Sequence, residues 1–128
     1  RESGGRVFFI DRVPYKYLLS LTNEADVGCL LIEPLGISNK FALPNKLFEY
    51  ALCGVPSLAS ALPNLDLYIN KYNLGKIINA SSISDLVSGA NFLLTQTRLK
   101  NHLKKNATKF FSWKTQENHF VRFVSNDK

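Results

Sequence analysis

The sequence predicts an α/β fold in which helices cover both faces of a parallel sheet. Two observations predict it. Short apolar runs of strand length alternate along the chain with longer segments in which apolar residues recur every three or four positions, and this order is typical of repeated strand-helix units. The length of 128 residues, with 45% hydrophobic and 20% charged residues, indicates one globular domain with a core of its own. We therefore expect a single domain over residues 1–128.

Four apolar runs are predicted to form the sheet. Parallel strands are expected to be apolar throughout because both faces of such a sheet are buried. The connection 35–43, which is rich in Gly, Ser, Asn and Lys, is predicted to be irregular. It lies beyond the carboxyl end of a strand, where ligands of open α/β sheets bind. The predicted strands are residues 7–10, 27–32, 56–60 and 75–78.

The central helix has the clearest limits. Pro44 suits its first turn, where the missing N–H is not needed, and Gly54 suits a left-handed residue just past its end. Ser82, with Asp85 three residues later, indicates a capping box for a later helix. The predicted helices are residues 15–23, 44–53, 65–72, 82–94, 97–110 and 114–124.

Polar side chains gather at the start of the central helix, namely Asn45, Lys46 and Glu49. Unpaired backbone N–H groups and the positive end of the helix dipole favour a phosphate there, and Lys46 adds a full charge. Glu49 has the wrong sign for phosphate, but its carboxylate can accept hydrogen bonds from the adjacent hydroxyls of a ribose. Together these features predict a nucleotide site.

The run Leu-Pro-Asn-Lys-Leu-Phe-Glu-Tyr at residues 43–50, followed by Cys-Gly-Val-Pro, resembles the donor-site segment of retaining GT-B glycosyltransferases of family 4. The resemblance implies a Rossmann-like fold, namely the C-terminal half of a GT-B enzyme, truncated at its N-terminus. In that family the Glu of the helix binds the donor ribose, and it matches Glu49. The usual signature has another Glu eight positions earlier, which contacts the transferred sugar, and Phe41 stands there in this chain.

Other matches are consistent with the resemblance. Pro44, Lys46 and Glu49 reproduce the Pro-x-Lys-x-x-Glu form of many relatives, and residues 7–13 resemble the strand and loop that border the nucleobase. Phe111-Ser112-Trp113 resembles the entry to the last helix of the family. The resemblance implies no metal and no cofactor, because the nucleotide diphosphate sugar is the donor substrate, and no catalytic residue is assigned. The expected donor-binding residues are Arg12, Val13, Asn39, Phe41, Leu43, Pro44, Asn45, Lys46 and Glu49.

A structural interpretation also fits several of these side chains. In the donor site they would contact phosphate, sugar or base; otherwise they are ordinary surface or packing residues. The surface interpretation applies to Asn39, Lys40, Lys46 and Glu49, and the packing interpretation to Phe41 and Val13.

Positive charge is concentrated in the basic C-terminal helices at residues 96–128. This segment holds eight basic and two acidic side chains, whereas the α/β core at 1–95 holds eight of each. A solvated face over a core-facing stripe is the first interpretation, and peripheral contact with anionic membrane lipids is the alternative. Nucleic acid is not expected as a partner, since no basic motif is interleaved with aromatic residues. The stripe consists of Leu99, Leu103, Ala107 and Phe110.

Cellular location and completeness follow from a few further features. Cys29 and Cys53 are expected to be buried, reduced thiols without a metal, which fits a cytoplasmic protein that could associate with a membrane. No leader and no run of eighteen apolar residues occurs. The chain begins with Arg1 and contains no Met, so we expect a piece of a longer protein that also has an N-terminal acceptor-binding domain.

Two functions from different classes remain open. The first is the donor-binding domain of a glycosyltransferase that moves a sugar from a nucleotide diphosphate sugar to a carbohydrate or lipid-linked acceptor, with retained stereochemistry as the family implies. The fragment alone is then expected to be inactive, since the cleft closes between two domains. The alternative is a non-catalytic Rossmann-like module that binds a nucleotide or a protein. Turnover by the full-length protein distinguishes them.

Overall fold

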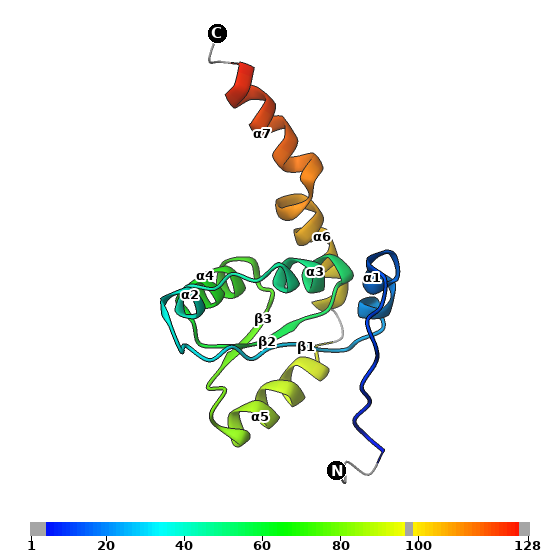
Figure 1. The fold of residues 1–128 in the computed structure, drawn as a ribbon, viewed down its shortest axis with the longest axis vertical. Coiled ribbons are helices and arrows are strands. Elements are labelled where there is room, and N and C mark those ends of the chain that lie inside the picture. Colours follow the sequence, from blue (N-terminus) through cyan, green and yellow to red (C-terminus); the bar gives the residue numbers. More distant parts are fainter. Residues whose placement is uncertain (1–4, 97–98, 126–128) are drawn as a thin grey trace.

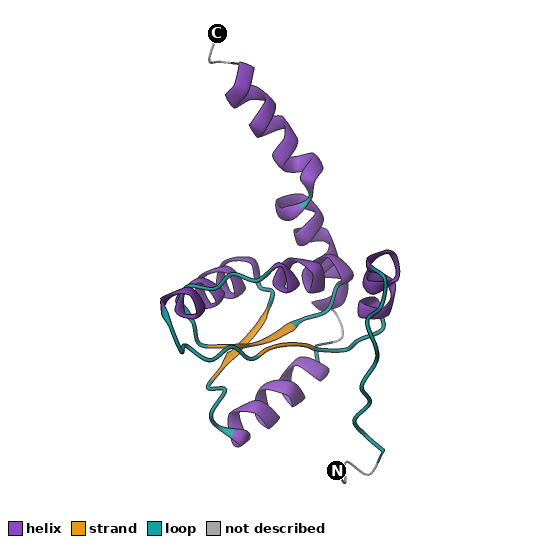
Figure 2. Cartoon of the chain, viewed as in Figure 1, coloured by secondary structure: helices purple, strands orange, loops and turns teal. Residues whose placement is uncertain are grey.

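The computed structural model of the chain describes residues 5–96 and 99–125. Within these residues the chain forms three parallel strands in the order β1-β2-β3. They are β1 (Gly28–Leu30), β2 (Ser57–Ser60) and β3 (Gly75–Ile78). Figure 2 shows the strands at the centre with helices around them. The predicted α/β class is confirmed, with a small parallel sheet.

Helices lie on both faces of this sheet. The connections from β1 to β2 and from β2 to β3 run through α3 and α4 on one face, as two crossovers of the same hand require, while α5 packs on the other face (Figure 1). The described helices are α1 (Tyr15–Asn23), α2 (Ile37–Lys40), α3 (Asn45–Cys53), α4 (Pro63–Tyr72), α5 (Ile83–Leu94), α6 (Leu99–Phe111) and α7 (Trp113–Ser125).

The main core lies between the sheet and helices α3, α4 and α6. Its largest side chains are fully buried. Aromatic rings pack together beside it: the centroid of the Phe48 ring lies 5.9 Å from that of Tyr68 and 4.9 Å from that of Phe111. The buried members are Leu30, Leu47, Ala51, Ala59, Leu62, Leu65, Ile69, Leu74, Leu103 and Ala107. Most of the apolar surface that stabilises α3 is therefore buried in this layer.

A smaller core lies under α5, where Leu58, Ile78 and Leu93 pack together. The helix begins as predicted, because the Ser82 hydroxyl oxygen accepts a hydrogen bond from the Asp85 N–H at 3.2 Å. This core holds α5 against β2 and β3.

The C-terminal helices divide into a buried part and an exposed part. Leu103 and Ala107 of α6 belong to the main core, and the Lys104 ammonium group donates to the Asn23 side-chain oxygen at 2.8 Å. The predicted apolar stripe is wrong at its end, since Phe110 is exposed and Phe111 packs on the core instead. Helix α7 contacts α6 and projects away from the sheet (Figure 1). In the described ranges, no helix combines the length and apolarity needed to cross a membrane.

The prediction of a strand at residues 7–10 is wrong. The structure shows an extended segment outside the sheet, with Val7, Phe8, Phe9 and Ile10 exposed and Phe9 97% so. An apolar run becomes a strand only when a neighbouring strand supplies hydrogen-bond partners, and this run has none among the described residues.

Several boundaries also differ from the prediction. The strand predicted at 27–32 is shortened to Gly28–Leu30, and the connection 35–43, predicted to be irregular, contains the short helix α2. Helix α4 begins two residues earlier than predicted because Pro63 occupies its first turn. Helix α6 ends at Phe111, its predicted start at residues 97–98 lies outside the described residues, and α7 extends one residue further at each end.

One of the two cysteines departs from the expectation. Both are free thiols, and Cys53 is buried, with its Sγ 3.4 Å from the Leu19 carbonyl oxygen of α1. Cys29 is exposed, which contradicts the predicted burial. Alternation along β1 places it on the face of Leu58, where α5 packs mainly against β2 and β3.

Candidate functional site

The N-terminus of α3 has no side-chain cap. Pro44 is the N-cap residue, with φ −72° and ψ 145°, rather than a residue of the first turn as predicted, and its carbonyl oxygen accepts from the Leu47 N–H at 3.0 Å. The first N–H groups of a helix have no acceptor within the helix. Gly54 ends the helix in the predicted left-handed conformation, at φ 75°. The helix therefore presents free donors and the positive end of its dipole at its first turn.

An open pocket of about 470 Å³ lies at this helix start and the carboxyl end of β1. This is the edge of a parallel sheet at which ligands of α/β proteins bind, and the volume is within the range of small-molecule sites. The residues that line it are Cys29, Leu30, Leu31, Ile32, Pro44, Asn45, Lys46 and Glu49.

The pocket brings together the polar residues predicted at the helix start. Asn45 and Lys46 are exposed and Glu49 is half-buried one turn further along α3. This arrangement can receive an anionic group at the N–H donors and the ammonium group, and a hydroxyl-bearing group at the carboxylate. Four of the nine predicted residues, from Pro44 to Glu49, therefore share one pocket.

The opposite wall of the pocket comes from β1 and was not predicted. Cys29, Leu30, Leu31 and Ile32 supply apolar surface and backbone groups there. A signal for them exists in the sequence, because the apolar run 27–32 ends at Glu33-Pro34, just before the polar connection 35–43. Ligands of open α/β sheets bind beyond the carboxyl ends of the strands. This rule predicts the end of the strand as part of the site as well as the connection that follows it.

Tyr50 packs beneath this site against the backbone of Gly28, whose position leaves no room for a side chain. Burial raises the pKa of the Tyr50 hydroxyl, and the neighbouring Cys29 and Glu49 raise this pKa further. Folding therefore favours the neutral phenol over the phenolate.

This raised pKa predicts a loss of stability at alkaline pH. Because the pKa of Tyr50 is higher in the folded state, its contribution to the free energy of unfolding is complete below the unfolded pKa of about 10. This contribution is lost as the pH rises through the folded pKa. We expect the melting temperature of the wild-type chain to fall more steeply above about pH 10 than that of Tyr50→Phe. Thermal melts of both chains from pH 8 to 11 measure this. Parallel curves would contradict a titration that is linked to folding.

The other predicted residues of the connection lie outside the pocket wall. Asn39 and Lys40 are exposed on α2, and the Lys40 ammonium group lies 5.8 Å from the centroid of the exposed Phe41 ring. Leu43 packs against the main core and does not line the pocket.

Arg12 and Val13 precede α1 and do not line the pocket. Arg12 is exposed and Val13 half-buried, in the same extended segment as the misassigned strand at 7–10. Figure 1 shows this N-terminal segment on the side of the sheet away from α2. The expectation that these two residues border a nucleobase stays a prediction.

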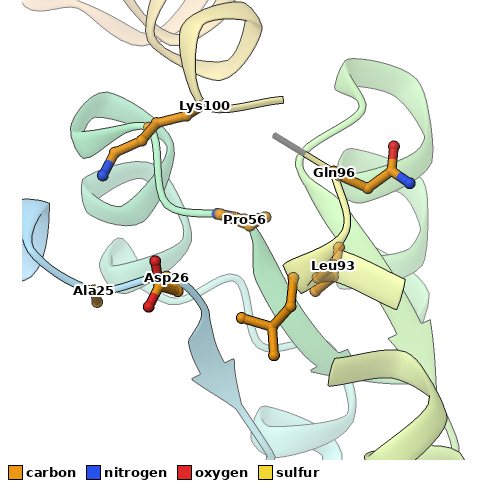
Figure 3. A pocket seen from close by; sticks show the side chains of 8 residues that line it. Ala25, Asp26, Pro56, Leu93, Gln96 and Lys100 are labelled. Atoms are coloured by element: carbon orange, nitrogen blue, oxygen red, sulfur yellow. The ribbon is translucent and has the colours of Figure 1, made fainter. Parts of the chain in front are cut away.

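A second, smaller hollow of about 220 Å³ lies at the opposite, amino edge of the sheet. Figure 3 shows Asp26, Pro56, Leu93, Gln96 and Lys100 around it. The Lys100 ammonium group is already bonded to the Asn23 carbonyl oxygen at 3.1 Å. This hollow therefore lacks the free helix donors that distinguish the pocket at α3.

Comparison with known proteins adds no identification. No protein-family model, curated protein or solved structure matches this chain. Among the described side chains, no group of three His, Cys, Asp or Glu residues is placed to hold a metal ion together. The site is thus defined by its own geometry, at the start of α3.

Proposed function

We propose that this chain is the donor-binding part of a GT-B-like glycosyltransferase, which transfers a sugar from a nucleotide diphosphate sugar to a carbohydrate or lipid-linked acceptor. The observation that carries the proposal is the uncapped N-terminus of α3, which opens into the pocket at the carboxyl end of β1 with Lys46 and Glu49 in its wall. The resemblance of residues 43–50 to the donor segment of that family supports the same assignment.

The roles of the residues follow from their chemistry. The backbone donors of α3 and the Lys46 ammonium group stabilise the diphosphate, which is also the leaving group when the sugar is transferred. The Glu49 carboxylate accepts hydrogen bonds from the ribose hydroxyls. The apolar residues at the carboxyl end of β1 cover one side of the nucleotide. An acceptor-binding domain completes the cleft for transfer.

A second candidate function is a module that binds the nucleotide without transferring sugar. The specific observation in its favour is Phe41, which stands where the resemblance expects a carboxylate for the transferred sugar and whose exposed side chain lies outside the pocket wall. A chain without this carboxylate retains the diphosphate and ribose contacts but lacks one contact to the sugar. Transfer or hydrolysis of the donor by the full-length protein supports the enzyme, and binding without turnover supports the module.

The proposed site predicts stabilisation by one nucleoside diphosphate. A ligand that binds the folded state at a hundredfold excess over its Kd adds about 2.7 kcal/mol to the free energy of unfolding. We expect this for one of UDP, GDP, ADP or CDP in a thermal-shift titration, and we expect Glu49→Ala to reduce the shift strongly because the ribose contact is lost. Glu24→Ala is the matched control, since Glu24 is exposed at the end of α1. No shift with any nucleotide, or an equal shift in Glu49→Ala, would remove the basis of the proposal.

A further inference from the structure

Two side chains hold the segment that joins β1 to α3, here named the β1–α3 connection (residues 31–44). The Ser60 hydroxyl oxygen, at the end of β2, accepts a hydrogen bond from the Ile32 N–H at 2.9 Å. The Asn64 amide nitrogen, in the first turn of α4, donates to the Phe41 carbonyl oxygen at 2.7 Å. The two bonds join the connection to the end of β2 and to the start of α4, so each bridges more than twenty residues of chain.

Between these two bonds the connection is not anchored by burial. Helix α2 contains no buried residue, and the side chains of Leu35 and Ile37 are 82% and 81% exposed. The connection makes local backbone bonds, such as the Lys40 N–H to the Gly36 carbonyl oxygen at 2.8 Å. These give it a shape of its own but do not fix its place on the sheet. Its position is therefore set by its two ends.

The ends of the connection are also the two walls of the candidate site. Leu31 and Ile32 line the pocket on one side and Pro44 on the other. Ser60 holds the first end directly and is only 4% exposed, so water competes weakly for its bond. Asn64 holds Phe41, three residues before Pro44. Neither Ser60 nor Asn64 lines the pocket.

We propose that Ser60 and Asn64 are positioning residues of the candidate site, which fix the spacing between the end of β1 and the start of α3 and thereby set the affinity for a nucleoside diphosphate. They act through the backbone of the β1–α3 connection and do not contact the ligand. This inference rests on the proposed function. It adds the end of β2 and the start of α4 to the parts of the chain that determine nucleotide affinity.

The test compares Ser60→Thr with Ser60→Val, which have the same shape and differ in the hydroxyl. The Kd of the nucleotide that the parent chain binds, chosen among UDP, GDP, ADP and CDP, is measured for each. We expect about a fivefold weaker Kd for Ser60→Val than for Ser60→Thr, the effect of one net hydrogen bond. Amide exchange of residues 31–44 in the ligand-free chain should also be faster in Ser60→Val.

A second pair keeps the test valid if the buried site does not accept a larger side chain. Asn64→Ala removes the donor at a partly exposed position, and Asn70→Ala is its control, because the Asn70 amide bonds only to Asp66 within α4, at 2.9 Å. We expect the same fivefold effect on nucleotide Kd for Asn64→Ala and none for Asn70→Ala.

The outcomes separate the two proposals. Equal nucleotide affinities within both pairs, in a parent chain that binds a nucleotide, would overturn the positioning role and leave the proposed function standing. A parent chain that binds none of the nucleotides would overturn the proposed function and, with it, the role of Ser60 and Asn64 in affinity. Weaker binding in Ser60→Val and Asn64→Ala alone, with faster exchange at 31–44, supports both.

Discussion

Replacement of Leu47 by Ala is expected to lower the free energy of unfolding by about 3 to 4 kcal/mol. Leu47 has no exposed surface and lies on the inner face of α3, within the main core that also includes Leu65 and Leu103. The substitution removes buried methyl groups and leaves a cavity between elements that come from distant parts of the chain. Urea unfolding with an unchanged m value measures the loss.

Leu67→Ala is the matched control for this prediction. Leu67 lies on α4 and its side chain is largely exposed, so the same chemical change is expected to cost no more than about 0.5 kcal/mol. Similar losses in the two variants would show that the core does not lie where the structure places it. Lys46 and Glu49 lie on α3, so loss of this helix also removes the binding residues. The Leu47 variant should therefore stop binding nucleotide at a lower temperature than the parent chain.

Gly75→Ala is expected to destabilise the chain by about 3 kcal/mol or more, through overpacking combined with backbone strain. Gly75 begins β3 with φ +156°, and a methyl group there would overlap the backbone nitrogen and carbonyl oxygen of Ser57 in the paired strand. Relief of this overlap requires β2 and β3 to separate, which would break the hydrogen bonds of the sheet. A thermal melt measures this: we expect a lower melting temperature for Gly75→Ala, or no folded protein at all.

Gly36→Ala provides the comparison for Gly75→Ala. Gly36 precedes α2 with an extended backbone, and a methyl group there meets no atom within 4 Å. Its substitution should change the free energy of unfolding by less than about 1 kcal/mol. A mild effect at Gly75 as well would mean that the strands are less closely paired than the structure shows.

The parts of the fold that the sequence predicts are those determined by neighbouring residues. Gly54 marks the end of α3 because a residue free of a Cβ takes the left-handed conformation there without strain. Ser82 marks the start of α5 because its hydroxyl reaches the N–H of Asp85. The polar start of α3 is also local, so Lys46 and Glu49 could be placed together in advance.

The parts that the sequence does not predict depend on distant residues. Residues 7–10 have the composition of a strand, but strand formation requires a partner, which composition does not specify. The exposure of Cys29 depends on where α5 packs, more than fifty residues later. Likewise, the bonds of Ser60 and Asn64 to the β1–α3 connection could not be inferred, because each joins residues more than twenty positions apart.

The buried residues of α6 determine where this chain can be shortened. A deletion after residue 95 would remove Leu103 and Ala107 and expose Leu47 and Ala51 of α3 to water, so the helix that carries the binding residues would lose its cover. A shortened chain that keeps this core covered must therefore continue at least to Phe111. The positive charge of the C-terminal helices is best varied by substitution at exposed positions, such as Lys105 and Lys109, while the length of the polypeptide is kept.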